Sequence, residues 1–216
     1  MAQAQSPSGG WKSGNESHFL AGFSHGAAGI IYSLAMLYSV RPKGYLQKAI
    51  HNGLEFENTL YDPAMNNWKD VRDDVPTGHW MWAWCHGPAG ILLSRMQTIT
   101  SAAAAHDRDI IHADMIKCAR ALESKVLDNN CLCHGNLGNT EILKSYACST
   151  QDNTLYQKTM LMRSCVVESL IDGTADCGDT YLYGYRFPGF MTGLAGMGYS
   201  LLRDIDAELP CVLGLQ

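Results

Sequence analysis

Basic residues are few in this sequence, and they do not cluster. Lys and Arg number 16 against 21 Asp and Glu, which gives a formal charge of −5 over 216 residues. Proteins that bind nucleic acid or an anionic membrane through phosphate groups usually carry a basic patch. The composition therefore argues against a phosphate-backbone binder.

Long apolar runs are also missing. The N-terminus, MAQAQSPSGGWKSGNES, has neither the basic start nor the apolar stretch of a secretory signal. Nowhere do the roughly 18 uninterrupted apolar residues of a membrane span occur. We therefore expect a cytoplasmic protein. In that reducing compartment its eight cysteines are available to a metal or to the core, because a chain with 46% hydrophobic residues needs no disulfides to fold.

Strands that alternate Val, Ile or Thr with polar residues are absent as well, so an all-α fold is expected. Residues 1–17 are rich in Ser, Gly and Gln without apolar periodicity, which predicts a flexible N-terminal segment. The folded domain is expected to cover residues 18–216. Other amphipathic helices are predicted over 45–57, 112–126 and 155–170.

Four segments that contain paired glycines stand out against this background. Their second glycines, Gly29, Gly90, Gly138 and Gly196, follow one another at intervals of 61, 48 and 58 residues. Apolar residues at helical spacing follow each pair, so the pattern predicts a repeat of two helices whose first helix begins at the glycines. Four such openings suggest loops that converge at one end of a helical barrel. Ordinary helix packing is the alternative explanation of a single glycine pair.

Potential metal ligands stand directly ahead of these glycines. Cys85 lies two positions before Gly87, and the pair Cys133 and His134 ends one position before Gly135. They occupy equivalent places in neighbouring repeats. A catalytic zinc commonly takes three ligands from Cys, His or carboxylate and leaves a fourth position to water or substrate. Two thiolates and one neutral imidazole would form such a set.

The remaining cysteines are more simply explained as core or surface thiols. An isolated Cys-His dipeptide is weak evidence for a metal, and Cys131, although close to Cys133, has no counterpart in another repeat. Arg72, the nearest arginine upstream of Cys85, is assigned no role. The cysteines placed outside the ligand set are Cys118, Cys131, Cys148, Cys165, Cys177 and Cys211.

The segments GFSHGAAGI, WCHGPAGI, CHGNLGN and PGFMTGLAGMGYSLLR resemble the successive signature segments of lanthionine synthetase C-like proteins. The ending is most similar to the cyclase domain of bacterial class II lanthipeptide synthetases. The resemblance implies an α/α toroid, with an inner ring of seven helices inside an outer ring and zinc at one mouth. This chain supplies about four of the seven glycine-led inner helices, so a partial toroid is expected.

The family's reaction is the addition of a peptide cysteine thiol to dehydroalanine or dehydrobutyrine, which forms a thioether. By resemblance, one zinc per chain on Cys85, Cys133 and His134 would hold the thiol as a thiolate. The enolate left by the addition needs a proton donor. His25 matches the family histidine usually given that role. His86 is a second candidate acid, with a solvated or ligand-supporting histidine as the alternative.

Three readings of function follow. The first is zinc-dependent thioether formation on a dehydrated precursor peptide, in which missing N-terminal repeats or a dehydratase would act as partners; neither nucleic acid nor a membrane span is expected. The second is a module that binds glutathione or a cysteine peptide without ring closure. The third is an inactive fragment, because repeat proteins tolerate the loss of a terminal repeat poorly. For His25, the alternative to the acid role is a helix-capping or core histidine.

Overall fold

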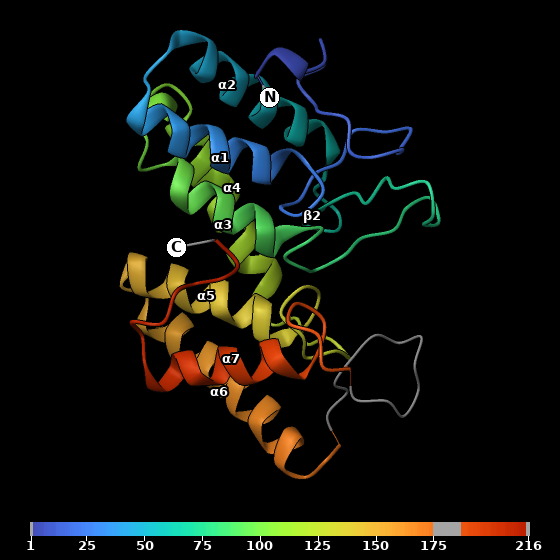
Figure 1. Ribbon diagram of the computed structural model, residues 1–216, viewed down its shortest axis with the longest axis vertical. Coiled ribbons are helices and arrows are strands. Elements are labelled where there is room, and N and C mark those ends of the chain that lie inside the picture. The colour runs from blue at the N-terminus through green and yellow to red at the C-terminus, as the bar shows by residue number, and fades with distance from the viewer. Residues whose placement is uncertain (1, 175–186, 215–216) are drawn as a thin grey trace. The chain divides into compact units, whose positions relative to one another are not determined.

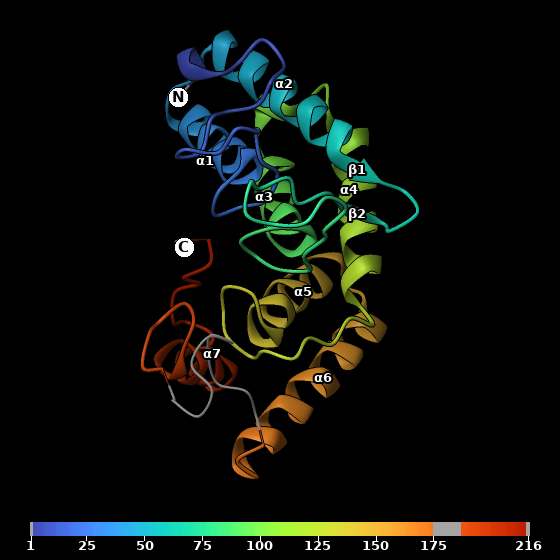
Figure 2. The ribbon, with the colours of Figure 1, turned by 90° about the vertical axis from the view of Figure 1, so that its right-hand side faces the viewer.

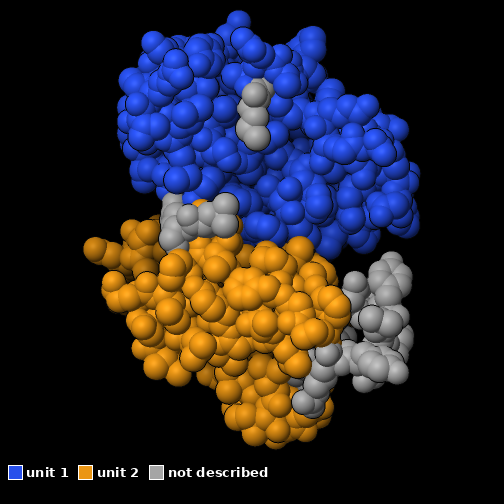
Figure 3. Space-filling model, viewed as in Figure 1, with its two compact units in different colours: residues 1–121 blue, residues 122–216 orange. Residues whose placement is uncertain are grey.

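The computed structural model describes residues 2–174 and 187–214. It consists of two compact units, residues 1–121 and residues 122–216 (Figure 3). Each unit is described by itself. Among the described residues, no helix is both long enough and apolar enough to cross a lipid bilayer.

Unit 1 is a group of helices in which α1 contacts both α2 and α3 (Figure 1). Its fully buried residues include Ile31 of α1, Leu54 of α2 and Ile91 of α3. A short antiparallel hairpin follows α2 directly (Figure 2). The elements are η1 (Ala2–Ala4), α1 (Ala27–Val40), α2 (Gly44–Leu60), β1 (Tyr61–Asp62), β2 (Asn67–Trp68), α3 (Pro88–Thr98), η2 (Ala102–Ala104) and α4 (Arg108–Leu122).

Unit 2 is built around α5 (Asn136–Thr150), which packs against α6 (Asn153–Ile171) and contacts α7 (Leu194–Ile205). The chain reverses sharply between α5 and α6. Gln151 ends α5 in the left-handed conformation, with φ of 56°, and the side chain of Asp152 then caps α6 by accepting a hydrogen bond from the backbone N–H of Leu155 at 2.9 Å.

The prediction of a helix at each glycine pair is confirmed, since α1, α3, α5 and α7 begin directly after Gly26, Gly87, Gly135 and Gly193. The preceding loop satisfies the first helical N–H, which has no partner within the helix. This donor bonds the carbonyl oxygen seven residues earlier at 2.9 Å in three helices: Ala27 to Leu20, Asn136 to Asn129, and Leu194 to Phe187. In α3 the same position is Pro88, which has no N–H to satisfy.

A steric constraint explains why the second residue of each pair is glycine. A Cβ there would overlap the backbone carbonyl oxygen of the residue six positions earlier, because the loop crosses closely over the first turn of the helix. The overlapping pairs are Gly29 with Phe23, Gly90 with Trp84, Gly138 with Leu132, and Gly196 with Phe190. The repeated sequence motif thus encodes one loop structure built four times.

Buried arginines connect the helices within each unit. In unit 1, Arg95 of α3 pairs with Glu57 of α2 at 2.8 Å and with Asp114 of α4 at 3.1 Å. Burial raises the pKa of Glu57, and the charge of Arg95 opposes this only in part. In unit 2, Arg163 of α6 pairs with Asp204 of α7 at 2.6 Å. These pairs fix which helices are neighbours, since separating either would leave a charge without its partner.

The N-terminal segment contacts α2 in the structure. Trp11 is buried, and the side-chain amide of Gln5 donates a hydrogen bond to the carbonyl oxygen of Ala49 at 2.9 Å. The division of the chain into a flexible segment of residues 1–17 and a cyclase domain of residues 18–216 stays a prediction.

Candidate metal and thiol site

Cys85 lies in the loop that leads into α3, and its side chain is buried. The ring of the preceding residue, Trp84, packs against Phe23 of the α1 loop at 5.5 Å between centroids. The two loops also approach through their backbones. At Gly22, which has φ of +100°, a Cβ would lie 2.6 Å from the carbonyl oxygen of Cys85. A glycine is therefore required to bring the α1 loop against the backbone of Cys85.

This approach places His25 of the α1 loop on His86 of the α3 loop. Their rings stack with centroids 4.9 Å apart and planes 6° from parallel. His25 is exposed, whereas His86 is buried. The two histidines proposed from the sequence as acids are thus neighbours, and His25 is the one that solvent can reach.

Burial lowers the pKa of His86 from its ordinary value. The thiolate charge of Cys85 and the carboxylate of Asp70 act against this shift, while the positive charges of Arg72 and His25 act with it. Unit 1 therefore favours a neutral imidazole beside Cys85.

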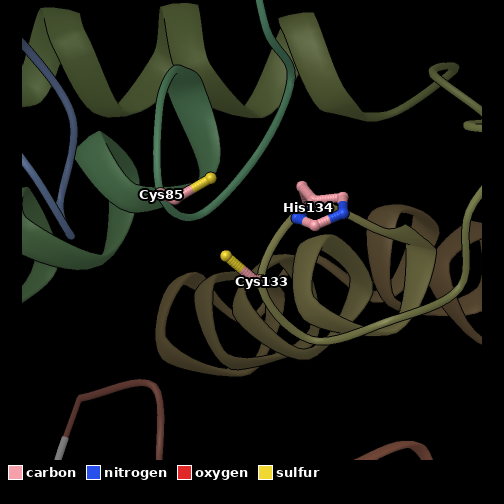
Figure 4. A group of neighbouring side chains, drawn as sticks. All are labelled: Cys85, Cys133 and His134. Carbon is pink, nitrogen blue, oxygen red and sulfur yellow. The ribbon is translucent and has the colours of Figure 1, made fainter. Parts of the chain in front are cut away.

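Cys133 and His134 lie in the loop that leads into α5 in unit 2, and both are half-buried (Figure 4). The backbone N–H of Cys133 bonds the carbonyl oxygen of Met191, in the loop ahead of α7, at 2.8 Å. The backbone N–H of His134 donates to the sulfur of Cys131 at 3.4 Å. Cys131 is itself fully buried, so it supports the backbone of the Cys-His pair.

Asparagines hold the start of the same loop. The side chain of Asn136 donates to the carbonyl oxygen of Leu127 at 2.7 Å and accepts the N–H of Leu127 at 2.8 Å. It also donates to the side chain of Asn130 at 2.8 Å. These hydrogen bonds satisfy the polar groups at the start of the loop that carries Cys133 and His134.

The loops ahead of α1, α3 and α5 carry histidine or cysteine at the same positions relative to the glycine that precedes the helix. Histidine stands one residue before the helix-opening glycine in each of them, as His25, His86 and His134, and cysteine stands two residues before it in two of them. The fourth loop has Met191 and Thr192 at these places. Figure 4 shows Cys85 on the loop ahead of α3 and the other two side chains on the loop ahead of α5. Each of the three offers one atom suited to a metal ion.

Residues 3–213 match the family model described as lanthionine synthetase C-like protein. This chain belongs to the lanthionine synthetase C-like family. A lacticin 481/lactococcin biosynthesis protein of Lactococcus lactis subsp. lactis is 29% identical over 201 residues, which cover 88% of this chain and 21% of that protein. The chain thus spans about a fifth of that curated relative's length.

The lanthionine synthetase C-like chain also has a solved structural neighbour. The structure of nisin cyclase matches it with a TM-score of 0.66 and 20% sequence identity, over 88% of this chain and 47% of that one. At this identity the likeness shows the fold. The prediction of an all-α fold of the α/α toroid class is therefore confirmed.

One further pair of charged side chains, Asp70 and Arg72, was given no role from the sequence. Asp70, which follows the β1–β2 hairpin, accepts a bidentate interaction from Arg72, with its Oδ1 3.0 Å from Nε and its Oδ2 2.7 Å from Nη2. The backbone N–H of Asp70 bonds the carbonyl oxygen of His79 at 3.0 Å, and this bridge returns the chain toward Cys85. No periodic pattern marks this irregular loop, so the sequence alone gave Arg72 no role.

The cysteines left outside the ligand set have varied surroundings. Cys118 is fully buried, and burial raises the pKa of its thiol well above the ordinary value. Cys148 and Cys165 are exposed on helices, and Cys211 is half-buried. Cys177 lies outside the described residues.

Proposed function

We propose that this chain catalyses zinc-dependent formation of lanthionine and methyllanthionine thioethers, by adding cysteine thiols of a dehydrated precursor peptide to dehydroalanine or dehydrobutyrine. The observation that carries the proposal is the common register of the loops, which sets Cys85 and Cys133 at equivalent places, with His134 directly after Cys133, ahead of glycine-led helices. Membership of the lanthionine synthetase C-like family supports it. Because the chain spans only part of its relatives, the activity is proposed and its partners are predictions from the sequence.

The donor set fits zinc. Two thiols and one imidazole are ligands that zinc favours, and a set of three leaves a coordination position for a substrate thiol. When bound, one zinc per chain would keep such a thiol deprotonated near neutral pH. Two thiolate ligands would already balance the charge of the ion, so an added substrate thiolate would remain electron-rich and reactive.

The chain's own residues would complete the reaction by moving a proton. Addition forms a bond from sulfur to the β-carbon and leaves an enolate whose α-carbon must gain a proton. His25 is the proposed donor, since it is exposed and lies beside the loop of Cys85. His86, stacked against it and buried, would act as a second proton-transfer group or hold the ring of His25 in place.

Zinc content and cyclisation together test the proposal. We expect purified wild-type chain to contain about one zinc and to consume the free thiols of a dehydrated, cysteine-containing peptide, as measured by alkylation and mass spectrometry. Cys85→Ala should lose both zinc and activity. Cys148→Ala, which removes an exposed thiol from α5, is the matched control and should retain both. A folded wild-type chain without zinc would contradict the proposed site.

His25→Ala separates catalysis from thiol binding. Loss of a general acid typically lowers a rate by about 10²- to 10⁴-fold, whereas zinc content and affinity for a thiol should change little. His112→Ala, which removes an exposed histidine from α4, is the control. If the wild-type chain binds zinc and thiols but leaves a dehydrated peptide unchanged, the thiol-binding module is the correct reading. An unchanged rate in His25→Ala would remove His25 from the mechanism.

The predictions of a cytoplasmic location and of an association with further N-terminal repeats or a dehydratase stay predictions. The precursor peptide is the partner that the proposed reaction requires.

A further inference from the structure

The β1–β2 hairpin leads into a charged pair that neither the ligand set nor the histidines use. The side chain of Asp70 is 1% exposed and that of Arg72 is 23% exposed. A carboxylate so deeply buried requires a fixed partner, and Arg72 supplies one through its Nε and Nη2 atoms. The pair is therefore held in one geometry, with the arginine partly open to solvent.

A third contact fixes the guanidinium further. Nη2 of Arg72 also lies 3.2 Å from the sulfur of Met81, which is the residue that begins the loop of Cys85. Met81 is anchored in turn, because its carbonyl oxygen accepts a hydrogen bond from the side chain of Asn67 at 3.0 Å. The hairpin and the cysteine loop thus clamp one edge of the guanidinium.

Asp70 shares a cavity with His86, one of the two histidines proposed to transfer a proton. A small cavity, about 10 Å³ in volume, is lined by Asp70, Met81 and His86 together. The hydrogen bonds that Arg72 donates to Asp70 raise the pKa of its guanidinium, which therefore keeps its positive charge. Arg72 contacts both Asp70 and Met81, so it is held next to the cavity that His86 also lines.

The other edge of the guanidinium is less engaged. Nη1 is 4.0 Å from Asp74, whose side chain is 75% exposed, and a pair of this kind is weak in water. The N–H groups on Nη1 can therefore donate to a ligand without breaking the contacts to Asp70 and Met81. A donor that is oriented before the substrate arrives stabilises developing negative charge most effectively.

We propose that Arg72, held by Asp70 and Met81, binds the carbonyl oxygen of the dehydroamino acid and stabilises the enolate that thiolate addition creates. As the new bond from sulfur to the β-carbon forms, the π bond between the α- and β-carbons breaks, and its electron pair moves through the α-carbon to this oxygen. The carbonyl is restored when His25 gives its proton to the α-carbon, and the proton released by the substrate thiol replaces it. Arg72 is then a catalytic residue, and Asp70 is its positioning residue. This inference rests on the proposed function.

The test compares Arg72→Met and Arg72→Lys in the full 216-residue chain with zinc. We expect kcat to fall by about 10²- to 10³-fold in Arg72→Met, with KM within a few-fold of wild type, because the interaction strengthens only as charge develops on the oxygen. Arg72→Lys should recover part of the loss, and methylguanidinium should partly rescue Arg72→Ala. A dehydroalanine peptide with its cysteine replaced by serine should bind wild type and Arg72→Met with similar affinity in fluorescence anisotropy.

Arg203→Met is the matched control and should leave kcat unchanged, because Arg203 pairs with Glu141 at 2.8 Å in unit 2. An active wild type alongside a folded, zinc-loaded Arg72→Met with normal kcat would overturn the role of Arg72 and leave the proposed function intact. A melting temperature lowered without any change in kcat would show that the pair is purely structural. A folded, zinc-loaded wild type that forms no thioether would overturn the proposed function and the role of Arg72 with it.

Discussion

At the scale of single residues, the carboxylate of Asp204 makes the stability of unit 2 depend on pH. Asp204 accepts hydrogen bonds from Arg163 at 2.6 Å and from Lys144 at 2.7 Å. Burial alone would raise the pKa of Asp204, but these two cations outweigh it and hold the pKa below the ordinary value of 3.8. The folded state therefore binds its proton less readily than the unfolded chain does.

The sign of this shift predicts a specific acid sensitivity. The stability that Asp204 contributes is fully present above pH 3.8 and is lost as the pH falls through the lower pKa of the folded state. Asp204→Asn should lower the free energy of unfolding by about 1 kcal/mol at neutral pH, a value reduced because the pair is partly exposed. The difference from wild type should shrink in thermal melts as the pH falls below 3.8. Asp128→Asn, which changes an exposed acid, is the control, and a constant difference across the pH range would contradict the assignment.

The sequence predicts those candidate site residues that belong to a repeated loop motif. The residues Cys85, Cys133, His134, His25 and His86 each stand at a fixed distance from a glycine, so a repeated motif suffices to find them. The ring stacking of His25 on His86 could not be predicted, because it depends on the approach of two loops about 60 residues apart in the chain. The pairing of Asp70 with Arg72 could not be predicted either, because a bridge from Asp70 to His79 and a contact of Arg72 with Met81 place these residues in an irregular loop.

At the scale of elements, the glycine-led helices were predictable because two local signals agree. Helical spacing of apolar residues marks each helix body, and the glycine pair marks its start. The predicted outer helices correspond to α2, α4 and α6 within a few residues at each end. The β1–β2 hairpin was not predicted, because two-residue strands are too short to show alternation.

The steric role of the second glycine gives a prediction within a single helix. Gly196→Ala in α7 should be strongly destabilising, because its Cβ would overlap the carbonyl oxygen of Phe190 and approach Leu132 at 2.9 Å. Gly198→Ala in the same helix meets no atom within 4 Å and should stabilise by about 0.5–1 kcal/mol, as alanine does in helix interiors. Chemical denaturation of both variants measures the contrast. Equal effects from the two substitutions would show that the close loop crossing is not what requires a glycine at position 196.

At the scale of the whole molecule, the proposed zinc is expected to add to the stability of the folded chain. A ligand bound only by the folded chain stabilises it by about 4 kcal/mol at a thousandfold excess over its Kd. The proposed zinc is therefore expected to raise the melting temperature of the chain.

Calorimetry with and without a chelator tests this expectation. Removal of zinc from wild type should lower the melting temperature by about 10 °C, as expected for a change of several kcal/mol in a chain of this size. Cys85→Ala should melt near the chelated wild type and respond little to zinc, whereas Cys148→Ala should respond like wild type. Identical melts of wild type with and without zinc would contradict the proposed zinc site.

The crossing of each loop over its helix also limits which mutations the loops can accept during evolution. The first helical N–H and the second glycine both meet carbonyl oxygens at fixed distances along the chain, seven and six residues earlier. An inserted or deleted residue would move those carbonyls out of register, whereas an exchanged side chain would not. The four loops can therefore diversify by substitution at constant length, which is how cysteine and histidine occupy places that methionine and threonine fill in the fourth.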